Sequence, residues 1–152
     1  MKTYQTLRDI VRSIADFHGK LREFYHTLES REERGRVRML LYYMSRHEKR
    51  FEDSLRTVGQ SRKKGILDTW LQYVPGDELL SLDGLDVSSD MSVDEVVRIS
   101  LEFDERLREF IRGIAGNPGL PRDVQDMFTQ IAEEEKSEES ELSVIADQIK
   151  GM

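Results

Sequence analysis

One helical motif occurs twice in this chain and constrains its fold more than any other feature. Residues 17–24 read Phe-x-x-x-Leu-Arg-Glu-Phe, and residues 103–110 read the same. Apolar residues at this spacing share one face of an α-helix, so each copy predicts a helix with an apolar stripe. An ionisable residue follows the first Phe of each copy, His18 in one and Asp104 in the other. The repeat therefore predicts two related helical units, each with a polar group facing the core.

Four segments of the chain carry apolar residues at the spacing of an amphipathic helix. Between the first two, Ser30-x-x-Glu33 predicts a capping box that starts one helix directly after the other. Such a short turn favours an antiparallel hairpin. Pro121 fits the first turn of the last helix, where its missing N–H does no harm. The predicted helices span about residues 6–29, 31–58, 93–115 and 121–149.

The segment 60–91 breaks this pattern and predicts a crossover connection. It contains turn signals at Pro75-Gly76 and Asp83-Gly84. A linker of this length can run back along a helix of about 24 residues, which is roughly 36 Å long. The second and third helices can therefore run parallel. The sequence predicts an all-α single domain over residues 1–152, a four-helix bundle of two antiparallel hairpins in the ferritin-like arrangement.

Composition narrows the range of partners. The net charge is -7, and Lys and Arg are interspersed with Asp and Glu, so we expect no nucleic-acid partner. Residues 1–12 lack an apolar signal region, and no stretch approaches the roughly 20 apolar residues of a membrane span. We therefore expect no membrane partner and a cytoplasmic location. The absence of cysteine leaves His, carboxylate and Met as the metal ligands available.

Ionisable residues interrupt the apolar stripes of all four predicted helices. Counting from the two predicted hairpin turns places these residues at one level of the bundle, where a buried charge is costly unless it is paired or bound to a metal. Glu135 and Glu138 are spaced i and i+3, like Met44 and His47, so each pair shares a helix face. The candidate metal-binding residues are His18, His47, Asp104, Glu135 and Glu138.

The chain resembles the rubrerythrin-like branch of the ferritin-like superfamily. The resemblance covers all four predicted helices and rests on the segments 17–25, 40–51 and 131–142. Such proteins are di-iron carboxylate enzymes, with one Glu each from the first and third helices and a Glu-x-x-His pair from each of the other two. His47 and Glu135 match that pattern. The Glu of the first, second and third helices is replaced by His18, Met44 and Asp104, and the His of the fourth helix is replaced by Glu138.

The resemblance implies a divergent metal site. Met44 cannot bridge hard cations, so the set can divide, with His18, His47 and Glu135 around one divalent ion of iron, manganese or zinc. Asp104 and Glu138 would either complete the coordination of this ion or hold a weaker second ion. The resemblance also implies oxidoreductase chemistry.

Metal-free readings of the same residues stay open. A lone His on an apolar face is often a hydrogen-bonded core residue, and the acidic run 133–139 is typical of a solvated face, where Glu134 would trade places with Glu135. Two protonated imidazoles would partly balance three buried carboxylates. The alternative function is therefore a non-catalytic scaffold or interaction bundle with a relic site. An iron-storage cage is a third option.

The crossover contains a short apolar patch with Trp70 at its centre. We expect the patch to pack the crossover on the bundle, with Trp70 as its anchor, or to form a dimer contact. A homodimer is therefore the expected assembly. The patch consists of Ile66, Leu67, Trp70, Leu71 and Tyr73.

Overall fold

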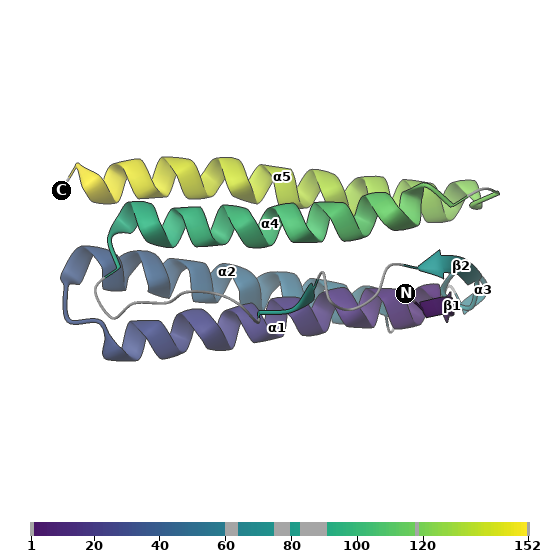
Figure 1. Cartoon of the computed structure of the whole chain (residues 1–152), viewed down its shortest axis with the longest axis horizontal. Coiled ribbons are helices and arrows are strands. Elements are labelled where there is room, and N and C mark those ends of the chain that lie inside the picture. The colour runs from purple at the N-terminus through teal and green to yellow at the C-terminus, as the bar shows by residue number, and fades with distance from the viewer. Residues whose placement is uncertain (1, 60–63, 75–79, 83–90, 118, 152) are drawn as a thin grey trace.

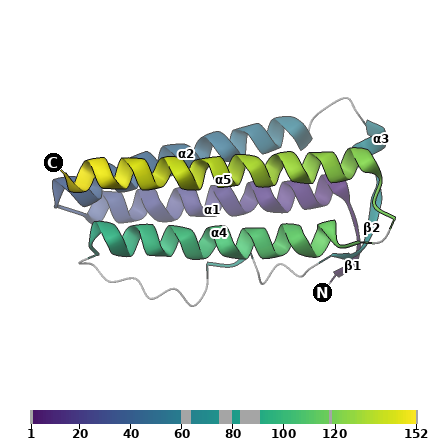
Figure 2. The same cartoon turned by 90° about the horizontal axis from the view of Figure 1, so that it is seen from above.

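The computed structural model is predominantly helical and describes residues 2–59, 64–74, 80–82, 91–117 and 119–151. Four long helices lie side by side, and a short helix and two strands lie at one end of them (Figures 1 and 2). This confirms the all-α class. The elements are β1 (Lys2–Thr6), α1 (Leu7–Arg31), α2 (Gly35–Gly59), α3 (Lys64–Leu67), β2 (Trp70–Val74), α4 (Val93–Ala115) and α5 (Arg122–Lys150).

The long helices form two antiparallel hairpins, α1 with α2 and α4 with α5 (Figure 1). The turn between α1 and α2 and the C-terminus lie at one end of the molecule, and β1, β2 and α3 lie at the other. Because α4 starts at the end opposite β2, α2 and α4 run in the same direction, as predicted. The turn signals at Pro75-Gly76 and Asp83-Gly84 lie outside the described residues. The specific ferritin-like arrangement stays a prediction.

Side-chain caps fix where two of the long helices begin. At α1, the Thr6 hydroxyl accepts from the Asp9 amide and the Asp9 carboxylate accepts from the Thr6 amide, a reciprocal capping box. At α4, the Ser92 hydroxyl accepts from the Glu95 amide at 3.2 Å. The capping box predicted at Ser30 is wrong. Helix α1 continues to Arg31, and the Ser30 hydroxyl donates to the Thr27 carbonyl inside that helix.

Two short strands were not predicted. β1 and β2 pair antiparallel, with Lys2 opposite Val74 and Thr6 opposite Trp70. Leu67 and Leu71 are buried in the core, which confirms that this part of the apolar patch packs on the long helices, whereas the side chain of Tyr73 lies outside the described residues. Trp70, however, is 66% exposed, so its predicted role as anchor is wrong. Successive side chains of a strand point to opposite faces, and burying Leu71 turns Trp70 outward.

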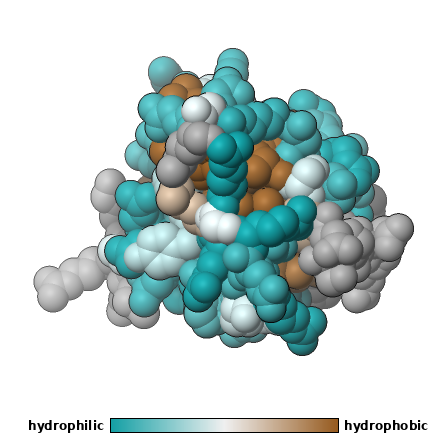
Figure 3. Space-filling model, turned by 90° about the vertical axis from the view of Figure 1, so that its left-hand side faces the viewer, coloured by the Kyte–Doolittle hydropathy of each residue, from teal (hydrophilic) through white to brown (hydrophobic). Residues whose placement is uncertain are grey.

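The apolar stripes of the long helices meet in one core. Both copies of the repeated motif contribute, because the Phe103 ring lies edge-on to the rings of Phe17 and Phe24 at 6.0 Å. Viewed from the end that holds the C-terminus, mostly hydrophilic side chains cover the surface and hydrophobic ones show between the helices (Figure 3). Among the described residues, each helix is too short or too polar to cross a membrane.

Candidate metal centre

His18 of α1 lies at the centre of the molecule between two carboxylates. Its side chain is 2% exposed, and its Nε2 lies 2.7 Å from an oxygen of Glu135 on α5. Its Nδ1 bonds to a carboxylate oxygen of Glu48 on α2. The ring stacks on Phe51 with the centroids 4.9 Å apart, so apolar and charged neighbours together hold one orientation. This buried triad joins three of the four long helices.

Glu48 is the site residue that the sequence analysis missed. It is 9% exposed and directly follows His47 on α2. A signal for it exists in the sequence, because Met44, Glu48 and Phe51 follow the i, i+4, i+7 spacing of a core-facing stripe. The structure therefore adds a carboxylate to the predicted set and leaves Met44 as an apolar core residue.

His47 occupies a second, more exposed position between carboxylates. Its side chain is 12% exposed, and its Nδ1 lies 2.6 Å from an oxygen of Glu138 on α5. Its Nε2 lies 3.7 Å from an oxygen of Glu141, one turn further along the same helix. The Tyr43 ring lies 4.3 Å from the imidazole, centroid to centroid. Both histidines of the candidate site thus bridge α5 to the first hairpin.

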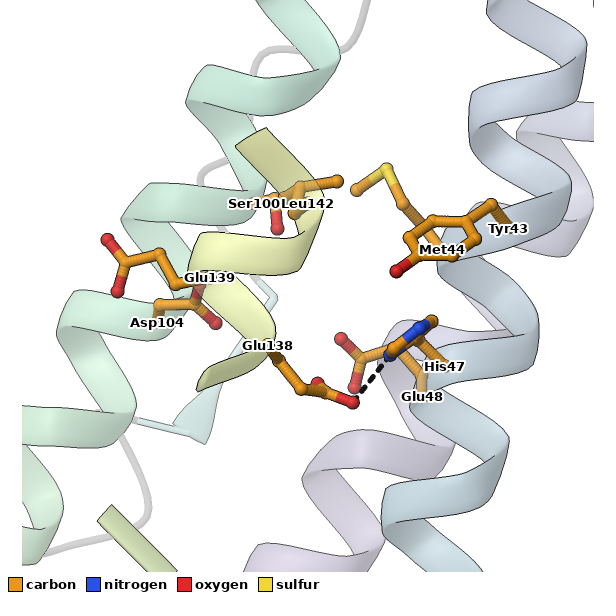
Figure 4. Close-up of a pocket in the computed structure, with 9 residues that line it drawn as sticks. All are labelled: Tyr43, Met44, His47, Glu48, Ser100, Asp104, Glu138, Glu139 and Leu142. Carbon is orange, nitrogen blue, oxygen red and sulfur yellow. Dashed lines mark hydrogen bonds and ion pairs between the residues drawn. The ribbon is translucent and has the colours of Figure 1, made fainter. Parts of the chain in front are cut away.

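Asp104 lies on α4 and lines a pocket together with His47, Glu48 and Glu138 (Figure 4). The pocket is polar, lies between α2, α4 and α5, and exposes carboxylates from all three helices. Its lining residues are Tyr43, Met44, His47, Glu48, Ser100, Asp104, Glu138, Glu139 and Leu142.

Burial and mutual repulsion shift the pKa values of these groups strongly. Burial, then Glu135 and Glu48, raise the pKa of Asp104 to about 8. Burial raises the pKa of Glu138 to about 7, although the bond from His47 opposes this. Burial opposes the charged form of His18, but Glu135 and Glu48 outweigh it and raise its pKa well above the usual value. The layer therefore retains protons at neutral pH.

All five residues predicted for the site lie in one layer of the molecule. Glu135 is buried and its neighbour Glu134 is exposed, which confirms that Glu135 faces the core. The groups pair with one another rather than converge on one point. Across residues 2–59, 64–74, 80–82, 91–117 and 119–151, no three His, Cys, Asp or Glu side chains are arranged as a ready metal-binding group.

Charge in this layer does not balance within the side chains themselves. It contains two histidines and four carboxylates, so that even with both imidazoles protonated the formal charge is negative. A bound cation or protons on the carboxylates would remove this imbalance. The six groups are His18, His47, Glu48, Asp104, Glu135 and Glu138.

Comparisons of the chain with protein-family models, with curated proteins and with solved structures give no match.

Proposed function

We propose that this protein binds at least one divalent metal ion in the buried layer between its four long helices. One observation carries the proposal. Six ionisable side chains, four of them carboxylates, are drawn from all four long helices and meet in one layer that no Lys or Arg among the described residues contacts. Buried carboxylates that lack a cation are costly, and a divalent ion would neutralise two of them. We further propose that the helices adopt the ferritin-like arrangement.

The donor set suits iron, manganese or zinc. Carboxylate oxygens and imidazole nitrogens are the ligands these ions prefer, and the layer offers four of the first kind and two of the second. Rubrerythrin-like proteins use the same inventory of four carboxylates and two histidines, distributed differently over the helices. In this chain Glu48 compensates for Met44, which the resemblance alone leaves without a carboxylate on the second helix. The site is therefore divergent in layout but complete in composition.

Binding requires the existing pairs to open. Glu48 and Glu135 would turn one oxygen each from His18 toward the ion. The bond between His47 Nδ1 and Glu138 would break, which frees both groups to bind the ion. Glu135 and Glu48 lie on opposite sides of the His18 ring, so both carboxylates must turn away from the ring before they can share one ion between α2 and α5. A bound iron or manganese ion would supply redox chemistry, and on this basis we propose an oxidoreductase.

Metal binding tests this function directly. Metal-free protein is titrated with Mn²⁺ or Zn²⁺, and bound metal is measured by elemental analysis after gel filtration. We expect about one or two ions per chain, and a loss of affinity of at least about tenfold in His47→Ala and in Glu48→Gln, because each change removes a ligand. His26→Ala is the matched control, since His26 is 74% exposed on α1 and lies outside the layer.

Two results would overturn the proposal. One is a wild-type protein that retains no metal, and the other is a Glu48→Gln protein that binds as tightly as the wild type. Far-ultraviolet circular dichroism of each variant checks that the helices are intact.

A metal-free interaction bundle is the second candidate function. It is favoured by the pairing in the structure, where both nitrogens of His18 already bond to carboxylates. Melting temperature separates the two candidates. A metal at 100 times its dissociation constant stabilises the fold by about 2.7 kcal/mol and raises the melting temperature, whereas a relic site gives no specific shift.

A further inference from the structure

We infer that cations reach the buried layer along three glutamates of α5 that lead inward from the solvent, the middle one of which lines the pocket between α2, α4 and α5. This inference rests on the proposed metal-binding function. The three residues are Glu141, Glu138 and Glu135.

Helix geometry arranges these glutamates as a graded series. They are three residues apart, and each step along α5 rises about 4.5 Å and turns about 60° short of a full revolution. The row therefore winds from the solvent face to the core face. The exposed fraction of the side chain falls from 59% at Glu141 to 23% at Glu138 and 5% at Glu135.

The two histidines connect the series into a continuous path of donors. Glu141 and Glu138 contact opposite nitrogens of His47, at 3.7 and 2.6 Å. Glu48 lines the pocket beside His47 and also bonds to His18, whose other nitrogen bonds to Glu135. In Figure 4 the carboxylate of Glu48 points toward Glu138 across the pocket. A cation passed along this path would meet a new oxygen or nitrogen at each step.

The Tyr25 hydroxyl lies at the inner end of the path. The Tyr25 side chain is fully buried, and its hydroxyl meets no partner at full hydrogen-bond geometry among the described residues. Ser100 is its hydrogen-bonding neighbour, Glu48 and Asp104 act on it through their charge, and all three line the pocket. A water molecule carried inward by the cation would complete the hydrogen bonding of this buried hydroxyl.

Glu139, which lines the pocket, and Glu141, at the outer end of the series, differ in their partners. Glu139 is neutralised by Arg108 at 2.8 Å. The structure pairs Glu141 with His47 and brings no Lys or Arg of the described residues against it. Glu141 is therefore the carboxylate best placed to capture a cation from solvent without lying in the buried layer itself.

The rate of metal uptake tests the route separately from the affinity. Full-length metal-free protein is mixed with Zn²⁺ in a stopped-flow instrument, with a fluorescent chelator reporting free metal. We expect Glu141→Gln to take up Zn²⁺ about tenfold more slowly at low ionic strength and to reach the wild-type stoichiometry, because steering affects rates rather than the final site. Glu133→Gln is the matched control, since it removes the same charge from an exposed position of the same helix.

Each outcome of this experiment decides the inference. Slower uptake in Glu141→Gln alone supports the route. Equal uptake in Glu141→Gln and wild type overturns it, and so does equal slowing in Glu133→Gln, which would show an effect of net charge. If the wild type takes up no Zn²⁺, the proposed function fails and this inference fails with it, a result distinct from the other two.

Discussion

At the scale of single residues, His18 and Glu48 determine the character of the buried layer. An imidazole with a carboxylate on each nitrogen is most stable in its protonated form, because both nitrogens then donate. Burial opposes that charge, yet the two glutamates outweigh it and the pKa of His18 rises. Asp104 faces the same glutamates without a comparable cation and stays protonated instead. Metal binding would therefore release protons.

The pKa shifts predict how the stability of the metal-free protein depends on pH. The pKa of Asp104 rises from 3.8 to about 8 in the fold, and that of Glu138 from 4.5 to about 7. Between those values the folded state binds more protons than the unfolded state, so the free energy of unfolding decreases as pH rises. His18 acts in the same direction, because its raised pKa gives stability that is present below pH 6.5 and lost as pH rises through the folded value.

Urea denaturation between pH 5 and pH 9 measures this effect. We expect the free energy of unfolding of the metal-free protein to fall by at least about 1 kcal/mol between pH 5 and pH 8. A pKa shift of one unit in each group would already allow a larger fall, because one unit corresponds to about 1.4 kcal/mol. Asp104→Asn should flatten part of the decline. A stability that is constant or increases over this range would show that the buried carboxylates do not hold their protons.

Sequence patterns predict five of the site residues because each interrupts an apolar stripe. His18 follows a repeated Phe, and Glu135 lies on the stripe between Ile131 and Leu142. The same pattern does not single out Glu48, because it is adjacent to His47 and both residues lie at helical spacing from other core residues of α2. Only the rotation of α2 against its neighbours decides which of two adjacent residues points inward. In this structure both do.

At the scale of secondary-structure elements, a glycine lets α1 and α2 pack around a buried carboxylate whose two arginine partners are partly exposed. Gly19 of α1 faces Glu52 of α2, which is 9% exposed. The Glu52 carboxylate accepts from Arg22 at 3.2 Å and from Arg56 at 2.7 Å. Arg22 lies one turn after His18 on α1, and Glu52 lies one turn after Glu48 on α2. The contact between Arg22 and Glu52 therefore also aligns His18 with Glu48 along the two helices.

Replacing this glycine should disturb the packing of the first hairpin. In Gly19→Ala the new Cβ would lie 2.6 Å from Glu52 Oε2, which forces the carboxylate away from Arg22 and Arg56. Ala gains about 1 kcal/mol of helix propensity over Gly, and displacing the Glu52 carboxylate offsets this gain, so in urea denaturation we expect Gly19→Ala to be less stable than Gly35→Ala by about 1 kcal/mol. Gly35→Ala is the control, because a Cβ there has open space and should leave stability unchanged or raise it slightly. Equal stability of the two variants would contradict this role of Gly19.

Helix existence was predictable from sequence, whereas exact ends and strands were not. The long helices have many periods of apolar spacing, and the predicted third helix matches α4 at both ends. At Ser30 the capping pattern is present, but the helix continues past it and ends at Arg31. β1 and β2 are five residues each and pair across more than sixty positions of sequence, so no local pattern specifies them.

At the scale of the whole molecule, the repeated motif places two hairpins against each other with their polar residues at one level. The aromatic contacts of Phe103 with Phe17 and Phe24 join the two copies in the core. Local sequence patterns do not predict how one hairpin is rotated relative to the other. The contact between His18 and Glu135 depends on this rotation. The homodimer stays a prediction, and Trp70, at 66% exposure, is one apolar side chain of the crossover patch available for it.

Anomalous X-ray diffraction from crystals grown with Mn²⁺ is the most direct test of a metal between the four long helices. We expect an anomalous peak in the buried layer, about 2.0–2.2 Å from oxygens of Glu48 and Glu135 and from a nitrogen of His18 or His47. Crystals of Glu48→Gln should show a weaker peak. Crystals with manganese bound only at surface carboxylates, and none between Glu48 and Glu135, would contradict the proposed function.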